Sequence, residues 1–352
     1  MKKKLLFALT VAGLMGWADA TAQQDVHFSQ FYYSPVHWNP AAAGATRGDM
    51  RAVATYRNQW ASVSTPFVTS AASFDAPVQT RNMGDNFLGI GLNFNHDQAG
   101  TQGMSNLNIN GAVSYSLDLG SRYKKPHYIS FGLNFGFLQR SFNTPESTWD
   151  RQWAGNGFDP TINNGEGTRG GKLARGNVTV GAGALWNYTF DDDKRFYLGA
   201  AMFHVNRPNM SLIEDFDNLY HKFTYMAGFE LGHPDRMTTF RPNIMAMMMG
   251  PNFFMNFGGD VTFDLTDRTA YTNYKNHLAA GFGIYHRLMD AMIFAVNIEY
   301  SNLRIGFAYD LNISGFDVAT GGNGGFEILL MYEPRFGGPD TQRQKLRRNK
   351  GL

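Results

Sequence analysis

The chain has 352 residues, of which 17% are charged and 14% are aromatic; it contains 39 glycines and no cysteine, and its formal net charge is +2. Without cysteine the protein can form neither disulfide bonds nor thiolate metal sites, and the small, dispersed charge gives no case for nucleic-acid binding. Soluble domains usually carry about 25% charged residues. The low charge, with many aromatic residues and glycines, therefore favours one large membrane β-barrel over two soluble domains.

The chain begins with the features of a secretory signal peptide. Three lysines at positions 2–4 precede an apolar stretch at 5–17, and small residues at 18–22 offer a cleavage site. The apolar stretch is too short and too uneven to be a spanning helix. We therefore expect residues 1–22 to be a signal peptide that is cleaved after Ala22.

The next segment, residues 23–48, is rich in aromatic residues and proline and precedes the first expected strand. Aromatic side chains at this density would be a liability if they were exposed, so we expect them to be buried. They either fill the lumen of the barrel as a plug or bind a partner, and a short segment at the periplasmic rim is the alternative. The candidate residues for this role are Phe28, Phe31, Tyr32, Tyr33, Trp38, Asn39 and Pro40.

Residues 49–334 show repeated alternation of apolar and polar side chains, which is the pattern of β-strands. Near the C-terminus, for example, Phe294 and Val296 would share one face of a strand, while Asn297 and Glu299 would share the other. The sequence predicts a transmembrane antiparallel β-barrel of about fourteen strands. The strands are expected to begin near Met50, Pro66, Asn86, Gly103, His127, Gly176, Arg195, His221, Thr238, Asn252, His277, Ala291, Leu303 and Gly325.

An even number of strands returns both ends of the barrel to the periplasm. The tight turns expected there are 191–194, 233–236 and 301–302, and the long connections expected outside the cell are 142–175, 206–220 and 314–324. The connection 266–276 departs from this rule because it is long but falls on the periplasmic side. Residues 335–352 form a basic tail, which we expect in the periplasm.

Motifs that could carry chemistry have simpler explanations. Gly89-Ile90-Gly91 lies inside an expected strand rather than before a helix, so it lacks the context of a nucleotide-binding loop. The methionines at 245 and 247–249 are expected to fill space rather than bind copper. Asp191-Asp192-Asp193 fits a solvated turn better than a calcium site. No spacing of Ser, His and Asp marks a catalytic triad, so we predict no enzyme activity, no cofactor and no metal.

Several motifs resemble the PorP/SprF family, outer-membrane proteins of the type IX secretion and gliding system of Bacteroidetes. The motifs are Gln24-Asp25, Phe28-Ser29-Gln30-Phe31, Asn39-Pro40-Ala41, Tyr56-Arg57-Asn58-Gln59-Trp60, Ser73-Phe74-Asp75, Asp97-Gln98-Ala99-Gly100 and Leu303-Arg304-Ile305-Gly306-Phe307-Ala308-Tyr309-Asp310. The resemblance covers nearly the whole mature chain. It adds Arg57 and Trp60 to the candidate plug or partner residues.

The resemblance implies a non-catalytic component of the outer membrane that supports secretion or surface anchoring of adhesin-like cargo. The implied partners are other type IX components in the periplasm or outer membrane, and cargo that carries a type IX C-terminal domain. The alternative function is transport of hydrophobic small molecules, as in fatty-acid channels, which would need a continuous apolar pocket that opens laterally. A plain porin is disfavoured because the glycine-rich inner faces are expected to lack a row of charges.

Overall fold

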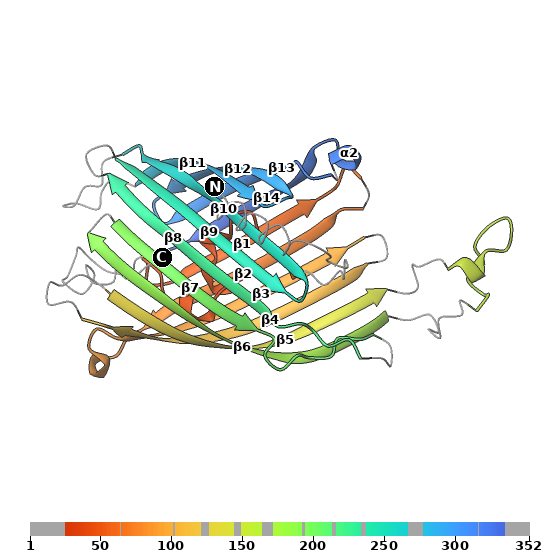
Figure 1. Cartoon of the computed structure of the whole chain (residues 1–352), viewed down its shortest axis with the longest axis horizontal. Helices are drawn as coiled ribbons and strands as arrows, with labels where there is room; N and C mark the ends of the chain where they lie inside the picture. Colours follow the sequence, from red (N-terminus) through yellow and green to blue (C-terminus); the bar gives the residue numbers. More distant parts are fainter. Residues whose placement is uncertain are drawn as a thin grey trace, which may run out of the picture.

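The computed structural model describes residues 25–63, 65–100, 103–120, 127–143, 149–163, 172–191, 194–212, 216–233, 237–266, 277–315 and 317–334. Fourteen antiparallel strands form a closed barrel in which each strand pairs with its neighbours in sequence and β1 pairs with β14 (Figure 1). The predicted fold and strand number are confirmed. The strands are β1 (Arg51–Gln59), β2 (Phe67–Val78), β3 (Phe87–Ala99), β4 (Met104–Asp118), β5 (His127–Asn143), β6 (Lys172–Asp191), β7 (Lys194–Phe203), β8 (Lys222–His233), β9 (Thr238–Met249), β10 (Asn252–Asp264), β11 (Leu278–Arg287), β12 (Ala291–Tyr300), β13 (Leu303–Asn312) and β14 (Asn323–Tyr332).

Burial alternates along the strands as the sequence pattern predicts. On β12, Phe294 and Ile298 are exposed on the outer face, whereas Ile293 and Asn297 are buried on the inner face. Successive side chains of a strand point to opposite faces, so an apolar outer face and a mixed inner face follow from the period of two. The outer surface of the barrel is therefore the surface that suits lipid. Among the described residues, no helix is long and apolar enough to cross a membrane.

The first strand begins and the last strand stops at the same end of the barrel, because Ala52 of β1 pairs with Tyr332 of β14. At this end β12 and β13 are joined by the tight turn predicted at 301–302. Strand β6 begins at Lys172, four residues before the predicted start at Gly176, and pairs with β5 over its added length. The predicted signal peptide at 1–22, the basic tail at 335–352 and residues 267–276 lie outside the described residues.

The N-terminal segment, by which we mean residues 25–46, lies inside the ring of strands. It is coloured red in Figure 1 and contains three short 3-10 helices, η1 (Phe31–Tyr33), η2 (Pro35–His37) and η3 (Pro40–Ala42). Prolines suit the first position of η2 and η3, because the first turn of a helix needs no N–H donor there. Phe31 is 1% exposed and Trp38 is 2% exposed, so the aromatic side chains of this segment form part of the core.

Candidate functional site

The start of the N-terminal segment is held by two carboxylates on the inner wall of the barrel. Glu327 of β14 accepts hydrogen bonds from the backbone N–H groups of Ser29 (2.7 Å) and Gln30 (2.9 Å). Asp310 of β13 accepts a hydrogen bond from the Ser29 hydroxyl group (2.7 Å). Hydrogen bonds to charged acceptors are shorter and stronger than neutral ones, so these contacts fix the segment against β13 and β14.

Arg57, a predicted site residue, links the wall to the segment. Its guanidinium group is buried, donates to the backbone carbonyl oxygen of His27 and pairs with Asp310 at 2.9 Å. Arg287 of β11 donates to the same Asp310 carboxylate at 2.6 Å. Because an unpaired buried charge is expensive, the segment and the wall depend on each other in this network.

The predicted aromatic residues are brought together in the lumen. The rings of Phe28 and Trp38 meet edge to face at 5.9 Å, and Phe31 meets Tyr285 of β11 in the same way at 6.1 Å. Tyr32 stacks on Tyr285, with the two ring centroids 4.9 Å apart. Such aromatic pairs each contribute about 0.5–1.5 kcal/mol beyond the area they bury.

Tyr33 makes a different contact, because the Arg304 guanidinium group of β13 lies over its ring at 4.7 Å from the centroid. Burial is the main reason that the pKa of Tyr33 is raised, so its hydroxyl group stays neutral near pH 7. Arg304 also pairs with Glu299 on β12. Tyr33 therefore packs against a cation whose charge the wall already balances.

Asn39 and Pro40 shape the turn that carries η3 across the lumen. The Asn39 side-chain oxygen accepts the Ala41 N–H at 2.9 Å and so caps η3, while its amide nitrogen donates to the Ala184 carbonyl oxygen on β6 at 2.9 Å. The chain passes close to β5 here. A Cβ atom at Gly132 would lie only 2.4 Å from the Pro40 carbonyl carbon. Gly132 therefore leaves the room through which the N-terminal segment passes.

The end of the N-terminal segment is anchored at the end of the barrel where β1 starts. The Gly44 N–H donates to Asp75 of β2 at 3.0 Å, and Asp75 pairs with Arg51 of β1 at 2.9 Å. Gly44 has φ +72°, a conformation that side chains disfavour, and it packs on the β2–β3 wall. Glu333 accepts a hydrogen bond from the Thr46 hydroxyl group.

Lys222 of β8 anchors the first described residue of the segment, because its ammonium group contacts the Asp25 carboxylate. His204, which follows β7, lies 3.9 Å from the same carboxylate. Burial alone would raise the pKa of Asp25, but Lys222 and His204 outweigh it and hold the pKa well below its usual range. Asp25 is therefore ionised at neutral pH, and the pair that it forms with Lys222 is neutral overall.

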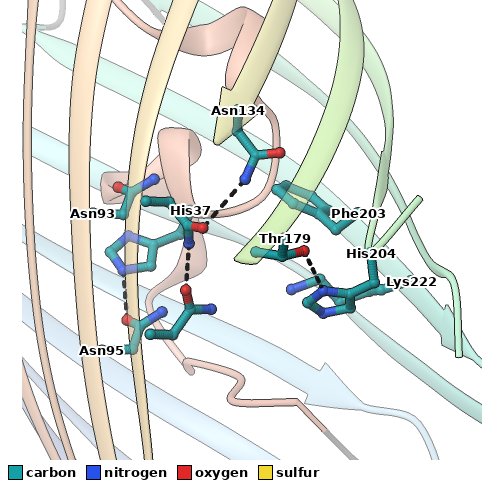
Figure 2. Close-up of a pocket in the computed structure, with 10 residues that line it drawn as sticks. His37, Asn93, Asn95, Asn134, Thr179, Phe203, His204 and Lys222 are labelled. Carbon is teal, nitrogen blue, oxygen red and sulfur yellow. Dashed lines mark hydrogen bonds between the residues drawn. The ribbon is translucent and has the colours of Figure 1, made fainter. Parts of the chain in front are cut away.

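A polar pocket lies between the N-terminal segment and the wall formed by β3 to β8 (Figure 2), and its cavity volume of about 10 Å³ is room for about one water molecule. His37 of η2 in the N-terminal segment forms a hydrogen bond through Nε2 with the side-chain oxygen of Asn95 on β3, at 2.7 Å. Burial lowers the pKa of His37 to about 4, so its ring is neutral near pH 7. The pocket is lined by His37, Asn93, Asn95, Asn108, Asn110, Asn134, Thr179, Phe203, His204 and Lys222. The sequence analysis did not identify this pocket.

Trp60 is the one predicted site residue that the structure does not bring to the others. It follows β1 at the far end of the barrel from Gly44, and its ring meets that of Phe67 edge to face at 5.1 Å. Its backbone φ is +56° and its N–H donates to the Gly324 carbonyl oxygen at 3.0 Å. Trp60 therefore helps to form the turn between β1 and β2.

The expectation that the inner faces lack a row of charges is wrong. The inner wall carries charged side chains that pair with one another or with the N-terminal segment. The buried ones include Arg51, Arg57, Asp75, Asp260, Arg287, Asp310 and Glu327, and Arg241 and Arg304 are partly buried. The sequence analysis gave weight to the glycines of these faces instead. The alternation itself contained the signal, since the period of two places Asp310 and Glu327 on the inner faces of β13 and β14.

The remaining chemical motifs lie in structural positions. Gly89 is inside β3, where a Cβ atom would lie 1.9 Å from the Ala43 carbonyl oxygen, so it gives room to the N-terminal segment. Met245, Met247 and Met249 are buried on the inner face of β9, while Met248 faces outward. Within the described ranges, no three His, Asp or Glu side chains are grouped in a way that could hold a metal ion.

A closed antiparallel barrel with an apolar outer surface is the architecture of outer-membrane β-barrel proteins. More specifically, residues 20–332 match the family described as "Type IX secretion system membrane protein PorP/SprF", and the chain belongs to this family. The family resemblance drawn from the sequence motifs is thereby confirmed. The barrel fold and the family together support an outer-membrane location.

Solved structures with a similar fold are also outer-membrane barrels. CdiB from Escherichia coli is 9% identical with a TM-score of 0.47, over 81% of this chain and 63% of that chain, so the present chain spans less than two thirds of CdiB. A mutant of the TodX monoaromatic hydrocarbon channel is 12% identical with a TM-score of 0.46, over 85% and 93%. A FadL homologue from Pseudomonas aeruginosa is 8% identical with a TM-score of 0.40, over 81% and 89%. These similarities concern the barrel fold alone. No curated protein matches the sequence.

Proposed function

We propose that the protein is a non-catalytic accessory barrel of the type IX machinery that supports secretion or surface anchoring of adhesin-like cargo carrying a type IX C-terminal domain. Membership of the family supports the secretion role. The observation that carries the proposal is the N-terminal segment, which is anchored in the lumen by Glu327, Asp310 and Arg57. We propose that residues 23–48 keep the lumen closed, and that the barrel acts through its surfaces.

The contacts of the segment favour the luminal role over direct partner binding. Phe28, Phe31 and Trp38 are each less than 4% exposed, so their rings are already covered by the barrel. A partner would have to meet the ends of the barrel, its connections or the basic tail at 335–352. We expect the partners to be type IX components in the periplasm or outer membrane, together with the cargo.

The alternative role, transport of hydrophobic small molecules, is less well supported. Such a channel needs a continuous apolar path, but the polar pocket is lined by carboxamides and by Lys222, which pairs with Asp25. A lateral exit would also need a gap between strands. The seam between β1 and β14 is paired from Ala52 to Gln59.

Deletion of the gene tests the proposal. Cells without the protein should keep an intact outer membrane and normal uptake of fatty acids, but should lose type IX cargo from their surface. Complementation with the full-length gene should restore the cargo. If deletion abolishes uptake of a lipid while cargo still reaches the surface, the accessory role is wrong and the transporter role replaces it.

A further inference from the structure

The connection between β5 and β6 is the longest of the barrel and carries a compact unit, residues 149–163, which we call the aromatic knob. The knob begins with the 3-10 helix η6 (Asp150–Gln152) and stands clear of the strand ends in Figure 1. Its chain closes on itself, because the Asp159 N–H donates to the Gln152 carbonyl oxygen at 2.8 Å and the Gln152 amide nitrogen donates to the Ile162 carbonyl oxygen at 3.1 Å. The knob is therefore an ordered surface.

This ordered surface exposes apolar side chains. Trp153 and Phe158 face each other across a β-bridge with their ring centroids 5.1 Å apart, yet they remain 53% and 49% exposed. The knob stands beyond the strands, so the bilayer that suits the outer face of the barrel does not cover these rings (Figure 1). Exposed apolar clusters mark interaction sites, and Trp is enriched among the residues that contribute most to binding.

A second apolar surface lies at the same end of the barrel, on three connections that are neighbours around the ring. We call it the rim patch, and its exposed residues are Val63, Met289, Ile313 and Val318. The three connections are tied together. The Ile313 N–H donates to the Asp290 carbonyl oxygen at 2.9 Å, and the Ser62 hydroxyl group donates to the last carbonyl oxygen of α2 (Asp317–Thr320) at 3.2 Å. Val318 of α2 is 92% exposed.

The knob and the rim patch lie on opposite sides of the barrel. Seven strands separate β6 from β13 in a ring of fourteen, and Figure 1 shows β6 and α2 on opposite sides. Fourteen strands about 4.8 Å apart and tilted by about 40° form a barrel about 28 Å wide. The chain from Asn143, the end of β5, to Trp149 spans at most about 22 Å. The knob therefore reaches a neighbouring barrel more readily than the rim patch of its own chain.

The membrane itself brings these two surfaces together. Copies of one outer-membrane barrel share the same orientation, so a sideways shift alone places the knob of one copy beside the rim patch of the next. Ile313 continues the outward-facing alternation of Leu311 on β13, so the patch faces sideways as well. Arg151 of the knob and Asp317 beside Val318 are both exposed, and their opposite charges suit the edge of such a contact.

We propose that the aromatic knob of one copy binds the rim patch of a second copy in the same membrane, with Trp153 and Phe158 packed against Val318. Different surfaces of the two copies meet in this contact. It therefore joins barrels head to tail into open rows instead of closed pairs. This inference does not depend on the proposed role in secretion.

Cross-linking of full-length barrels in isolated outer membranes tests the proposal. The chain has no cysteine, so Ala154→Cys in the knob and Ala319→Cys in α2 each introduce a single exposed thiol. The two variants carry different tags and are produced in the same cells. A short bis-maleimide should give a dimer that contains both tags, with at least about tenfold less dimer from either variant alone. A chain with both cysteines should give a ladder of dimers, trimers and larger products.

Further substitutions locate the contact. Val318→Ser in the Ala319→Cys chain should lower the yield of mixed dimer at least about tenfold, and its exposure leaves folding unaffected. Trp153→Ser in the Ala154→Cys chain should do the same, whereas Asn156→Ser, at an exposed polar position of the knob, should leave the yield unchanged. Retention of heat-modifiable migration shows that each variant is folded.

Three results would overturn the proposal. The first is the absence of a mixed dimer, and the second is equal dimer formation by either single-cysteine variant alone, which would indicate a symmetric contact or random collision. The third is a chain with both cysteines that forms only a cross-linked monomer, because the knob would then bind the rim patch of its own barrel.

Discussion

Glu327 offers a selective way to loosen the N-terminal segment without breaking the wall. Its two carboxylate oxygens accept the N–H groups of Ser29 and Gln30, at 2.7 and 2.9 Å, and the side chain is 1% exposed. Glu327→Gln keeps the shape but replaces one acceptor by a donor and removes the charge. The change removes a negative charge near Arg57, while Arg57 and Arg287 keep their ion pairs with Asp310.

The expected loss of docking free energy follows from these contacts. One charge-assisted hydrogen bond is lost and the other is weakened, and bonds to charged groups contribute about 1.5–3 kcal/mol each. We expect docking of the segment to weaken by about 2 kcal/mol, which corresponds to about a thirtyfold change in the equilibrium between docked and released segment. Amide hydrogen exchange at Ser29 and Gln30 reports this equilibrium, because both N–H groups must leave Glu327 to exchange.

The matched control is Glu299→Gln, because Glu299 pairs with Arg304 on the neighbouring strand rather than with a backbone N–H of the segment. Exchange at Ser29 and Gln30 should rise about thirtyfold in the Glu327 variant and change little in the control, while the barrel strands stay protected in both. Equal exchange in the two variants, or loss of protection throughout the barrel, would show that Glu327 does not hold the segment in this way.

Three further predictions concern the faces, the orientation and the pH dependence of the barrel. Phe294→Arg places a charge on the lipid face and should lower the free energy of unfolding, measured with urea in lipid, by about 2–4 kcal/mol if the residue lies near mid-bilayer. Phe294→Leu should lower it far less, and equal losses of stability would refute the assigned face. A cysteine that replaces the exposed Asn156, between β5 and β6, should react with an impermeant maleimide on intact cells. A cysteine that replaces the exposed Asn82, between β2 and β3, should not react. The reverse labelling would show that the barrel has the opposite orientation in the membrane. In the docked segment the pKa of His37 is about 4, whereas in a released segment it returns to about 6.5, so the released segment binds more protons below pH 6.5. Docking of the segment should therefore weaken by up to about 3 kcal/mol as the pH falls from about 6.5 to about 4, and hydrogen exchange of the segment should show this loss. A His37→Gln variant with the same loss would contradict the assignment to His37.

The sequence was informative about the barrel because period-two alternation is a local property. Phe294 and Asn297 could be assigned to opposite faces from their spacing alone, and the structure agrees. The aromatic cluster could be predicted to be buried, since exposed rings are unfavourable, but its contacts could not. Arg57 meets Asp310 across 253 positions of sequence, and only closure of the barrel brings them together.

The polar pocket was missed for the same reason. Its asparagines alternate with outward residues on β3, β4 and β5, where each looks like an ordinary inner-face residue. Their meeting with His37 depends on where the N-terminal segment turns, which is set by Pro35 and Pro40 and by the room beside Gly132. The position of Trp60 in a turn depends likewise on strand lengths, which the alternation does not define to within a residue.

The most direct test of the central claim, that the N-terminal segment keeps the lumen closed, is the ionic current through the purified full-length protein in a planar lipid bilayer. We predict that inserted wild-type barrels carry no steady current, because the aromatic cluster and the ion pairs around Arg57 and Asp310 hold the segment across the lumen. A variant that lacks residues 25–46 should produce open channels, and these channels show that the procedure inserts the barrel into the bilayer. A steady, reproducible conductance from the wild-type protein would contradict the account.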